Sequence, residues 1–567
     1  MTDNFNFTDE RFADIQMLRY RLDDFDNLTL NQKLYIYYLS EATLCGRDIT
    51  TDQFCRYNLR IRRTLEAVYV NYIGERDCDE FHALTVYLKR VWFSNGIHHH
   101  YGCEKFVPNF TEDYFRSVVL TTSTDIASKV GVDQHFNLPL VADETVEALL
   151  DDICPVIFNQ KIMAKRVNQK AGDDLVATSA CNYYEGLTQK EVENFYAKMR
   201  EDDADNAATP ISYGLNSTLR KTSEGCVKED VWCAEGLYGS AIKHIVYWLS
   251  KAAEVAENQR QIEIINLLIE YYSTGNLQTF DKYSIEWLKE HEGRVDFING
   301  FIEVYGDPLG LKASWEGIVH YKDLVATRFR KPQVVGVTAN VVCAAMLGGD
   351  EYPSTAIGIN LPNADWIRAR YGSKSITIGN LTHAYNQAAR GNGFAQEFVI
   401  DDATREMIDK WGDVCDDLHT DLHECLGHGS GQLLPGVSAD ALGSYGSTIE
   451  EARADLFGLY YIADPKLTEL GLTPSLEAYR SQYYTYMMNG LLTQLTRIQP
   501  GNEIEEAHMR NRALIARWTL EHYPSAVKLV EQDGKTYVEI TDYLELRNAF
   551  ATLLAEIQRI KSEGEFE

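Results

Sequence analysis

The chain has 567 residues, of which 45% are hydrophobic and 24% charged, an ordinary composition for a globular protein with room for two or more hydrophobic cores. Its formal net charge of −30 argues against a nucleic-acid partner, because binding to phosphate backbones needs basic patches. No run of about 18 apolar residues occurs, so the sequence predicts no membrane span.

The N-terminal residues carry neither a basic segment nor an apolar core, so we predict a cytoplasmic protein unless a signal peptide has been removed. The 11 cysteines include no Cys-x-x-Cys pair, which favours reduced thiols over a disulfide framework. There is no internal repeat and no low-complexity linker.

The first 280 residues are predicted to be mainly helical. Thr29-Leu30-Asn31-Gln32 has the capping-box pattern of a helix start, apolar residues follow at helical spacing, and Gly46 is the expected stop. Ser240–Gly275 is a second long helical pattern, interrupted at most once, near Glu257.

The pattern changes after Phe301. Short runs rich in β-branched residues and bounded by Gly, Pro or Asn predict four strands, over Phe301–Tyr305, Val334–Thr338, Thr355–Leu361 and Ser375–Ile378. Helices dominate again from Ala403 onward, with a strand pair expected around Lys535–Ile540. We therefore expect an α+β fold, mainly α, with a small β-core in the middle of the chain.

The segment His423-Glu424-Cys425-Leu426-Gly427-His428 places a glutamate between two histidines. In the zinc-peptidase pattern His-Glu-x-x-His the histidines are four residues apart and share a helix face. Here they are five apart, which leaves their side chains roughly 140° apart in a regular α-helix. A local π-bulge would restore a common face, and Gly427 is the residue best suited to that distortion. The segment therefore predicts a π-bulge that brings both histidines to one Zn²⁺.

A third zinc ligand is expected in the acidic helix that begins Glu450-Glu451-Ala452-Arg453-Ala454-Asp455. Glu451 and Asp455 are four residues apart and share a face. Glu451 can bind the ion, while Asp455, together with Glu450, supports the ligand histidines. Three protein ligands leave an open position for water. The alternative for this helix taken alone is a solvated acidic face.

Other histidines and one cysteine compete with this assignment. His419 and His423 are four apart and share a face without any bulge, but no glutamate stands between them. The adjacent residues of His98-His99-His100 do not share a face in a helix or a strand, which favours a structural or cleft-lining role. Cys425 is expected to serve packing rather than metal binding.

The two motifs together resemble the signature of the dipeptidyl peptidase III family, in which a six-residue zinc motif with an inserted glycine is followed by Glu-Glu-x-Arg-Ala-Glu/Asp. The resemblance extends over most of the chain. It is carried by Glu303 with Tyr305-Gly306-Asp307-Pro308-Leu309-Gly310, Ile359-Asn360-Leu361-Pro362-Asn363, Ala507-His508-Met509 with Arg512 and Arg517, Ile560-Lys561-Ser562, and Trp92–Gly102.

The resemblance implies two lobes separated by a wide cleft, one helical and zinc-bearing, the other with helices around the β-core. The expected division assigns residues 1–323 to the lower lobe, 324–344 to the upper lobe, 345–392 to the β-core, 393–558 to the helical zinc lobe and 559–567 to the lower lobe. The family normally continues beyond the equivalent of Lys561, so we expect a less closed cleft and a less ordered Lys561 in a chain that ends at Glu567.

Glu424 is the expected general base, which takes a proton from the zinc-activated water and returns it to the leaving amine. The resemblance implies that His508 and Tyr305 donate hydrogen bonds to the oxyanion that develops on the scissile carbonyl. The alternatives are a surface helix histidine and a core aromatic residue.

The resemblance also implies a site for a free peptide N-terminus. Glu303 supplies a carboxylate for the ammonium, and Asn360 and Asn363 supply amide oxygens, unless the asparagines serve only as turn residues. The cations expected at the peptide backbone or its C-terminal carboxylate are Arg512, Arg517 and Lys561, with surface salt bridges as the alternative.

We therefore expect a metallo-exopeptidase with one Zn²⁺ per chain that releases dipeptides from short peptide substrates. One alternative is a zinc aminopeptidase or endopeptidase of other specificity. Another is a non-catalytic peptide-binding protein with a structural zinc, against which Glu424 argues, because a structural site needs no base.

Overall fold

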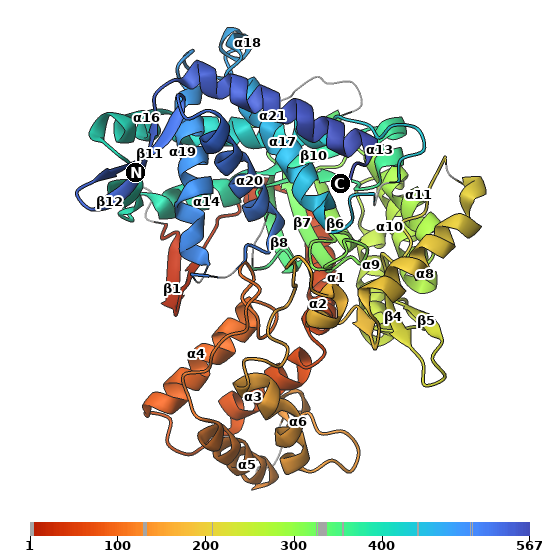
Figure 1. Ribbon diagram of the computed structural model, residues 1–567. Coiled ribbons are helices and arrows are strands. Elements are labelled where there is room, and N and C mark those ends of the chain that lie inside the picture. Colours follow the sequence, from red (N-terminus) through yellow and green to blue (C-terminus); the bar gives the residue numbers. More distant parts are fainter. Residues whose placement is uncertain are drawn as a thin grey trace.

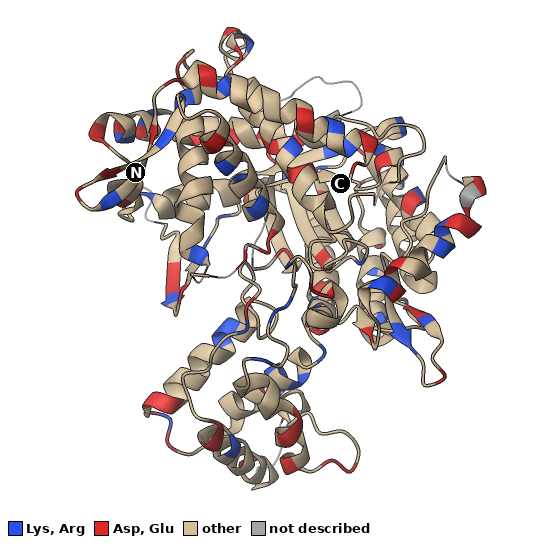
Figure 2. Cartoon of the chain, in the orientation of Figure 1, with Lys and Arg blue, Asp and Glu red and all other residues tan. Residues whose placement is uncertain are grey.

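The computed structural model describes residues 5–128, 133–206, 208–324, 326, 337–353, 356–438, 441–498, 500–501 and 503–566. Helices predominate around a smaller set of strands, which confirms the predicted mainly α, α+β class (Figure 1). None of the described helices combines the length and hydropathy needed to cross a bilayer. Lys and Arg are interspersed with Asp and Glu throughout the molecule, so the excess of acidic residues is not confined to one element (Figure 2).

A five-stranded mixed sheet forms the centre of the molecule, in the order β6-β7-β8-β10-β9. Strand β10 runs parallel to β8, and the other neighbouring pairs are antiparallel. The strands span Val295–Phe301 (β6), Trp315–Lys322 (β7), Val337–Gly349 (β8), Gly358–Leu361 (β9) and Ser373–Ile378 (β10).

Helices from the first half of the chain share a continuous hydrophobic core with this sheet. The first of these helices lies directly on the sheet, and the others pack in turn on it and on one another. The sheet residues Trp315 and Ile318 belong to the same core. These helices span Leu30–Cys45 (α1), Gly239–Glu254 (α9), Gln259–Thr274 (α10) and Leu277–Leu288 (α11).

A separate helical cluster projects away from the sheet at the bottom of Figure 1 and has its own core. It contains Asn58–Asn71 (α3), Asp79–Phe93 (α4), Glu112–Ser128 (α5) and Val146–Phe158 (α6), and Arg47–Phe54 (α2) leads into it. The predicted lower lobe, residues 1–323, thus contains more than one core.

The second half of the chain forms a helical layer over the sheet with a third large core. Its main helices span Asp402–Leu422 (α16), Gly446–Ile462 (α17), Tyr479–Leu491 (α19), Ala507–His522 (α20) and Tyr543–Glu563 (α21). A hairpin of Val527–Gln532 (β11) and Lys535–Ile540 (β12) packs with them and confirms the predicted late strand pair.

Smaller elements complete the fold. A three-stranded sheet is built from Tyr184–Glu185 (β3), Ser217–Lys221 (β4) and Val227–Val231 (β5), and a hairpin from Thr8–Phe12 (β1) and Ile15–Leu18 (β2). Within the described residues, the remaining α-helices are Leu175–Thr178 (α7), Gln189–Asp202 (α8), Asp365–Tyr371 (α13), Gly379–Ala389 (α14), Phe394–Phe398 (α15) and Pro465–Glu469 (α18).

Capping signals in the sequence located the early helices well. Thr29 and Gln32 form the predicted capping box, and Gly46 is the C-cap of α1. Ser240–Gly275 divides into α9 and α10 with the break between Glu254 and Gln259, and Gly275 ends α10 in the left-handed conformation.

The strand predictions need correction. Residues 302–305 are not a strand: β6 ends at Phe301, and its seven residues are all buried, so they show no alternation that would mark the end of the strand. For the same reason β7 was not predicted. Residues 334–336 and residue 355, within two predicted strands, lie outside the described residues. The described parts of these two predictions contain the start of β8 and all of β9.

The predicted division into lobes is corrected at one segment. Residues 337–344, expected in the upper lobe, belong to β8 and pair with β7 and β10 in the central sheet. The expected boundary at residue 559 falls inside the continuous helix α21. The other boundaries remain predictions.

Candidate metal centre and catalytic cleft

The histidine motif forms a π-helical turn, His423–His428 (η4), that continues directly from α16. The predicted π-bulge is confirmed. The widened turn brings Nε2 of His423 to 3.0 Å from Nε2 of His428. Since five residues of regular α-helix would leave the side chains roughly 140° apart, the π geometry creates the common ligand position.

Gly427 lets this turn lie directly against α17. A Cβ added at Gly427 would stand 2.6 Å from Cα and 2.8 Å from Cβ of Ala454. Gly427 is not among the glycines with positive φ, so the π-turn does not need glycine's conformational freedom here. Contrary to our expectation, glycine is required by the close approach of the two helices.

Glu451 contributes a third converging atom from α17. Its Oε2 lies 3.4 Å from His423 Nε2 and 3.6 Å from His428 Nε2. The side chain is 2% exposed, and Oε2 has no hydrogen-bond partner within the described residues. Because a buried carboxylate oxygen without a partner is costly, its position indicates that a cation belongs at this point.

Two further carboxylates of α17 fix the histidine rings. His423 Nδ1 lies 2.7 Å from Asp455 Oδ1, and His428 Nδ1 lies 2.8 Å from Glu450 Oε1. A neutral imidazole that donates through Nδ1 carries a lone pair on Nε2. Both lone pairs then face Glu451 Oε2. Two imidazoles and a carboxylate fit zinc in kind and in number, and leave an open position.

Glu450 is held as an anion by two cations, Arg453 and Lys561. Arg453, fully buried, donates to Glu450 Oε1 and Oε2 at 2.7 and 2.9 Å, and Lys561 ion-pairs with Oε2. Burial opposes ionisation, but Arg453 and Lys561 hold the pKa of Glu450 well below its usual range. Lys561 is therefore engaged by Glu450 rather than free to meet a peptide.

His419 belongs to a second group of atoms close enough for a metal, with His423 and Asp455. In that group His419 Nε2 lies 3.2 Å from Asp455 Oδ1, the oxygen that also accepts from His423 Nδ1. Hydrogen bonds thus already satisfy the second group, whereas Glu451 Oε2 has none within the described residues. The geometry favours the Glu451 group.

The tract His98-His99-His100 is occupied by contacts within the protein. His98 Nε2 lies 2.7 Å from the Met163 carbonyl, His100 Nδ1 lies 3.1 Å from Ser94 Oγ, and His99 Nδ1 accepts from two backbone amides. These contacts agree with the predicted structural role, and His100 also lines the cleft.

Glu424 stands beside the convergent donor atoms. Its Oε1 is 3.9 Å from His423 Nε2, and its Oε2 has no hydrogen-bond partner in the part of the chain that the structure describes. Burial raises the pKa of Glu424. The sheet braces the same residue, because Asn360 Nδ2 and Ser375 Oγ donate to the Glu424 carbonyl at 3.1 and 3.3 Å.

The donor atoms open onto a cleft of about 1300 Å³, lined by the sheet on one side and by the helical layer on the other. Most of the predicted site residues meet here. Those lining the cleft are Glu303, Tyr305, Asn360, Asn363, His423, Glu424, His428, Glu450, Glu451, Asp455, His508, Arg512 and Lys561. Arg517 is exposed on α20 and is not among the residues that line it.

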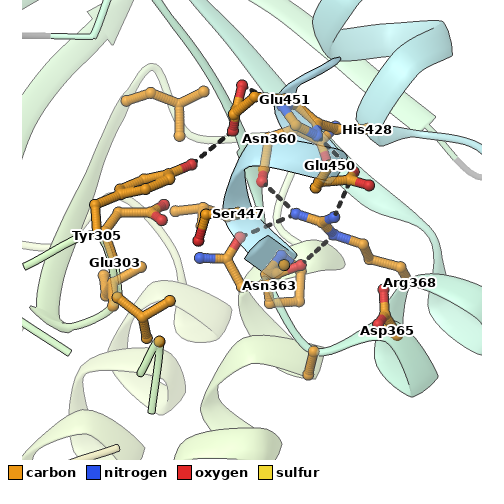
Figure 3. Close-up of a pocket in the computed structure, with 18 of the residues that line it drawn as sticks. Glu303, Tyr305, Asn360, Asn363, Asp365, Arg368, His428, Ser447, Glu450 and Glu451 are labelled. Carbon is orange, nitrogen blue, oxygen red and sulfur yellow. Dashed lines mark hydrogen bonds and ion pairs between the residues drawn. The ribbon is translucent and has the colours of Figure 1, made fainter. Parts of the chain in front are cut away.

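The loop after β6 carries Glu303 and Tyr305 toward the metal centre. The Tyr305 hydroxyl donates to Glu451 Oε1 at 2.7 Å (Figure 3). Asp307 fixes the loop, because its buried carboxylate accepts from the backbone N–H groups of Leu311 and Lys312 at 2.7 and 2.8 Å.

His508 lies at the start of α20, with Nε2 3.4 Å from Glu451 Oε2. Glu506 caps the helix and places Oε1 2.6 Å from His508 Nδ1. Although partial burial disfavours the imidazolium, the carboxylates of Glu451 and Glu506 raise the pKa of His508 to about 9. We had not singled out Glu506, whose place two residues before the histidine marks a helix cap.

The two asparagines differ in their contacts. Asn360 is 5% exposed, uses its amide nitrogen on the serines of β10 and on Glu424, and leaves Oδ1 without a partner among the described residues. Asn363 Oδ1 instead accepts from Arg368 at 2.9 Å. Burial raises the pKa of Glu303, and a hydrogen bond from Asn363 opposes that shift. Arg368, which lines the cleft, was not among the predicted residues.

Comparisons with known proteins relate the chain to a family of peptidases. A family model described as Peptidase family M49 matches residues 181–334 and 352–442. Dipeptidyl peptidase 3 of Nematostella vectensis is 22% identical over 91% of this chain and 80% of its own length, and that of Homo sapiens 23% over 86% and 74%. A solved dipeptidyl-peptidase III from Corallococcus sp. strain EGB shares the fold, with a TM-score of 0.67 and 17% identity over 97% of this chain and 88% of that one.

The contact between the π-turn and α17 yields a stability prediction. Gly427→Ala forces a methyl group into the Ala454 backbone and should lower the free energy of unfolding by about 1–3 kcal/mol. Gly412→Ala, in α16, meets only Ile408 Cγ2 at 3.4 Å and should be neutral or stabilising by up to about 1 kcal/mol. Denaturant titration of the metal-free proteins measures both. Equal effects of the two substitutions would contradict the packing role of Gly427.

Proposed function

We propose that this chain, which belongs to peptidase family M49, is a zinc metallopeptidase that releases dipeptides from the free N-termini of short oligopeptides. The observation that carries the proposal is the convergence of His423 Nε2, His428 Nε2 and Glu451 Oε2. Beside them lies Glu424 Oε2, which has no hydrogen-bond partner among the described residues. The relatives named above supply the class of reaction, and the family resemblance inferred from the sequence is confirmed.

His423, His428 and Glu451 would hold the ion, and Asp455 and Glu450 would keep the two imidazoles aimed at it. Zinc in such a site supplies a Lewis acid that lowers the pKa of water to about 7 and polarises a carbonyl. The donor set supports zinc over Mg²⁺ or Ca²⁺, which prefer oxygen ligands.

Glu424 acts as the general base. Its free Oε2 accepts the proton of the attacking water, and the carboxyl group then returns it to the leaving amine. A burial-raised pKa suits both steps, because it strengthens the base and keeps the acid form accessible.

His508 donates to the oxyanion that develops on the scissile carbonyl, since neighbouring carboxylates favour its protonated form. The Tyr305 hydroxyl, which lies against Glu451, is the second donor on this side of the cleft. Both groups are held beside the metal ligands by contacts already present in the protein.

The free N-terminus of the peptide binds at Glu303 and Asn360. Glu303 supplies the carboxylate, and Oδ1 of Asn360, which has no partner within the described part of the chain, accepts a hydrogen bond from the ammonium. Asn363 contributes indirectly, because its oxygen is taken by Arg368. Arg512 forms no ion pair of 4 Å or less within the described residues and is placed to meet the distal part of the peptide.

The cytoplasmic location inferred from the sequence remains a prediction.

The role of Glu424 leads to a prediction on turnover. Glu424→Gln keeps the shape of the side chain and leaves the metal ligands intact, but removes the base, so kcat should fall by about 10²–10⁴-fold with the metal content unchanged. Steady-state kinetics combined with metal analysis measures both quantities. Substantial turnover by a metal-loaded Glu424→Gln protein would show that another group deprotonates the water.

The ammonium site leads to a prediction on specificity. N-acetylation of a good peptide substrate should lower kcat/KM by at least about 10²-fold, because Glu303 and Asn360 lose the charged group that satisfies them. Glu303→Ala should weaken cleavage of free peptides in the same direction. Mass spectrometry of a tetrapeptide digest should show two dipeptides. Single amino acids as first products, or unchanged cleavage of the N-acetylated peptide, would leave a metallopeptidase of other specificity.

A further inference from the structure

Arg368 of α13 connects the turn that carries the two asparagines to the metal centre (Figure 3). Its guanidinium donates to the Asn360 carbonyl at 3.0 Å, the Pro362 carbonyl at 2.6 Å and Asn363 Oδ1 at 2.9 Å. One planar fork thus satisfies three acceptors of a single four-residue turn. Only 15% of the side chain is exposed, so water competes weakly for these bonds.

These contacts fix which way the Asn363 amide faces. Arginine has donors only, so the oxygen of Asn363 must point toward Arg368. The amide nitrogen of Asn363 then lies on the side of Glu303, away from Arg368, as Figure 3 shows. Since Asn363 is exposed, its amide would be free to turn without Arg368. Arg368 therefore acts on Glu303 through Asn363.

The other side of the guanidinium faces the metal centre. Arg368 Nη1 is 3.9 Å from Glu450 Oε1, the oxygen that lies 2.8 Å from His428 Nδ1. This second contact is replaceable, because Arg453 and Lys561 already compensate the charge of Glu450. Substitution of Arg368 should therefore change the conformation of residues 360–363 and leave the metal content unchanged.

We propose that Arg368 is a positioning residue that sets the ammonium-binding groups at a fixed place relative to the metal centre, by orienting Asn363 and, through it, Glu303. The inference rests on the proposed function. An exopeptidase that removes two residues needs its N-terminal anchor held at one distance from the scissile bond, and a misplacement of about 1 Å can cost 10²-fold in rate. A lysine has no planar fork and cannot span the three acceptors.

The test compares Arg368→Gln and Arg368→Lys with the wild type and with a control, Arg370→Gln. Arg370 lies on the same helix, is exposed, and donates to the Ala208 carbonyl outside the cleft. We expect kcat/KM for a free peptide to fall by about 10²-fold in Arg368→Gln, through a higher KM from the weakened ammonium contact and a lower kcat from the misplaced scissile bond. Metal content should remain that of the wild type, and Arg370→Gln should match the wild type.

Arg368→Lys distinguishes positioning from simple charge. The lysine variant should keep its metal and its thermal unfolding midpoint, yet show a raised KM like the glutamine variant. Full recovery by lysine, an unchanged KM in Arg368→Gln, or loss of metal with KM preserved would each overturn the proposal. If the wild type releases no dipeptides, the proposed function fails together with this inference. If the wild type releases dipeptides and Arg368→Gln has the same kcat/KM as the wild type, only the inference about Arg368 fails.

Discussion

The metal centre depends on how closely the π-turn can approach α17. Gly427 faces the backbone of Ala454 with no room for a side chain, and this contact sets the distance between the histidine turn and the acidic helix. His428 then meets Glu450, His423 meets Asp455, and both Nε2 atoms face Glu451. One inserted residue in the zinc motif thus does two things: it widens the helical turn, and its lack of a side chain admits the partner helix.

The remaining parts of the site are arranged around this pair of helices by the sheet and by charge. The sheet supplies Asn360 and Ser375, which hold the Glu424 carbonyl, and the loop after β6 delivers Tyr305 to Glu451. The buried carboxylate of Glu450 is tolerated because Arg453 and Lys561 compensate its charge. Among the described residues, the two buried carboxylate oxygens without a hydrogen-bond partner, on Glu451 and Glu424, are those that face the place of reaction.

The sequence predicted those structural features that depend on residues close to one another along the chain. The five-residue spacing of His423 and His428 required a π-bulge, and the pattern at Thr29 predicted a helix start that the structure confirms. Features that depend on tertiary contacts were missed. The fully buried β6 shows no alternation, so a strand was predicted over Phe301–Tyr305, whereas the structure has it over Val295–Phe301. Arg368 meets Asn363 and Glu450 only because α13 folds back across the turn at Pro362, which no spacing in the sequence reveals. The same contact takes up the Asn363 oxygen, which we had assigned from the sequence to the ammonium group of the peptide.

The most direct test of this account is the zinc content of the purified protein after equilibration with one equivalent of zinc and removal of unbound metal. We expect one zinc per chain in the wild type and in His419→Ala, since His419 only hydrogen-bonds to Asp455. His428→Ala and Glu451→Gln should each lose most of the metal, by more than the roughly 10–100-fold in affinity that a supporting hydrogen bond contributes. Full zinc occupancy in both variants, or loss of zinc in His419→Ala, would contradict the assignment of His423, His428 and Glu451 as the metal ligands.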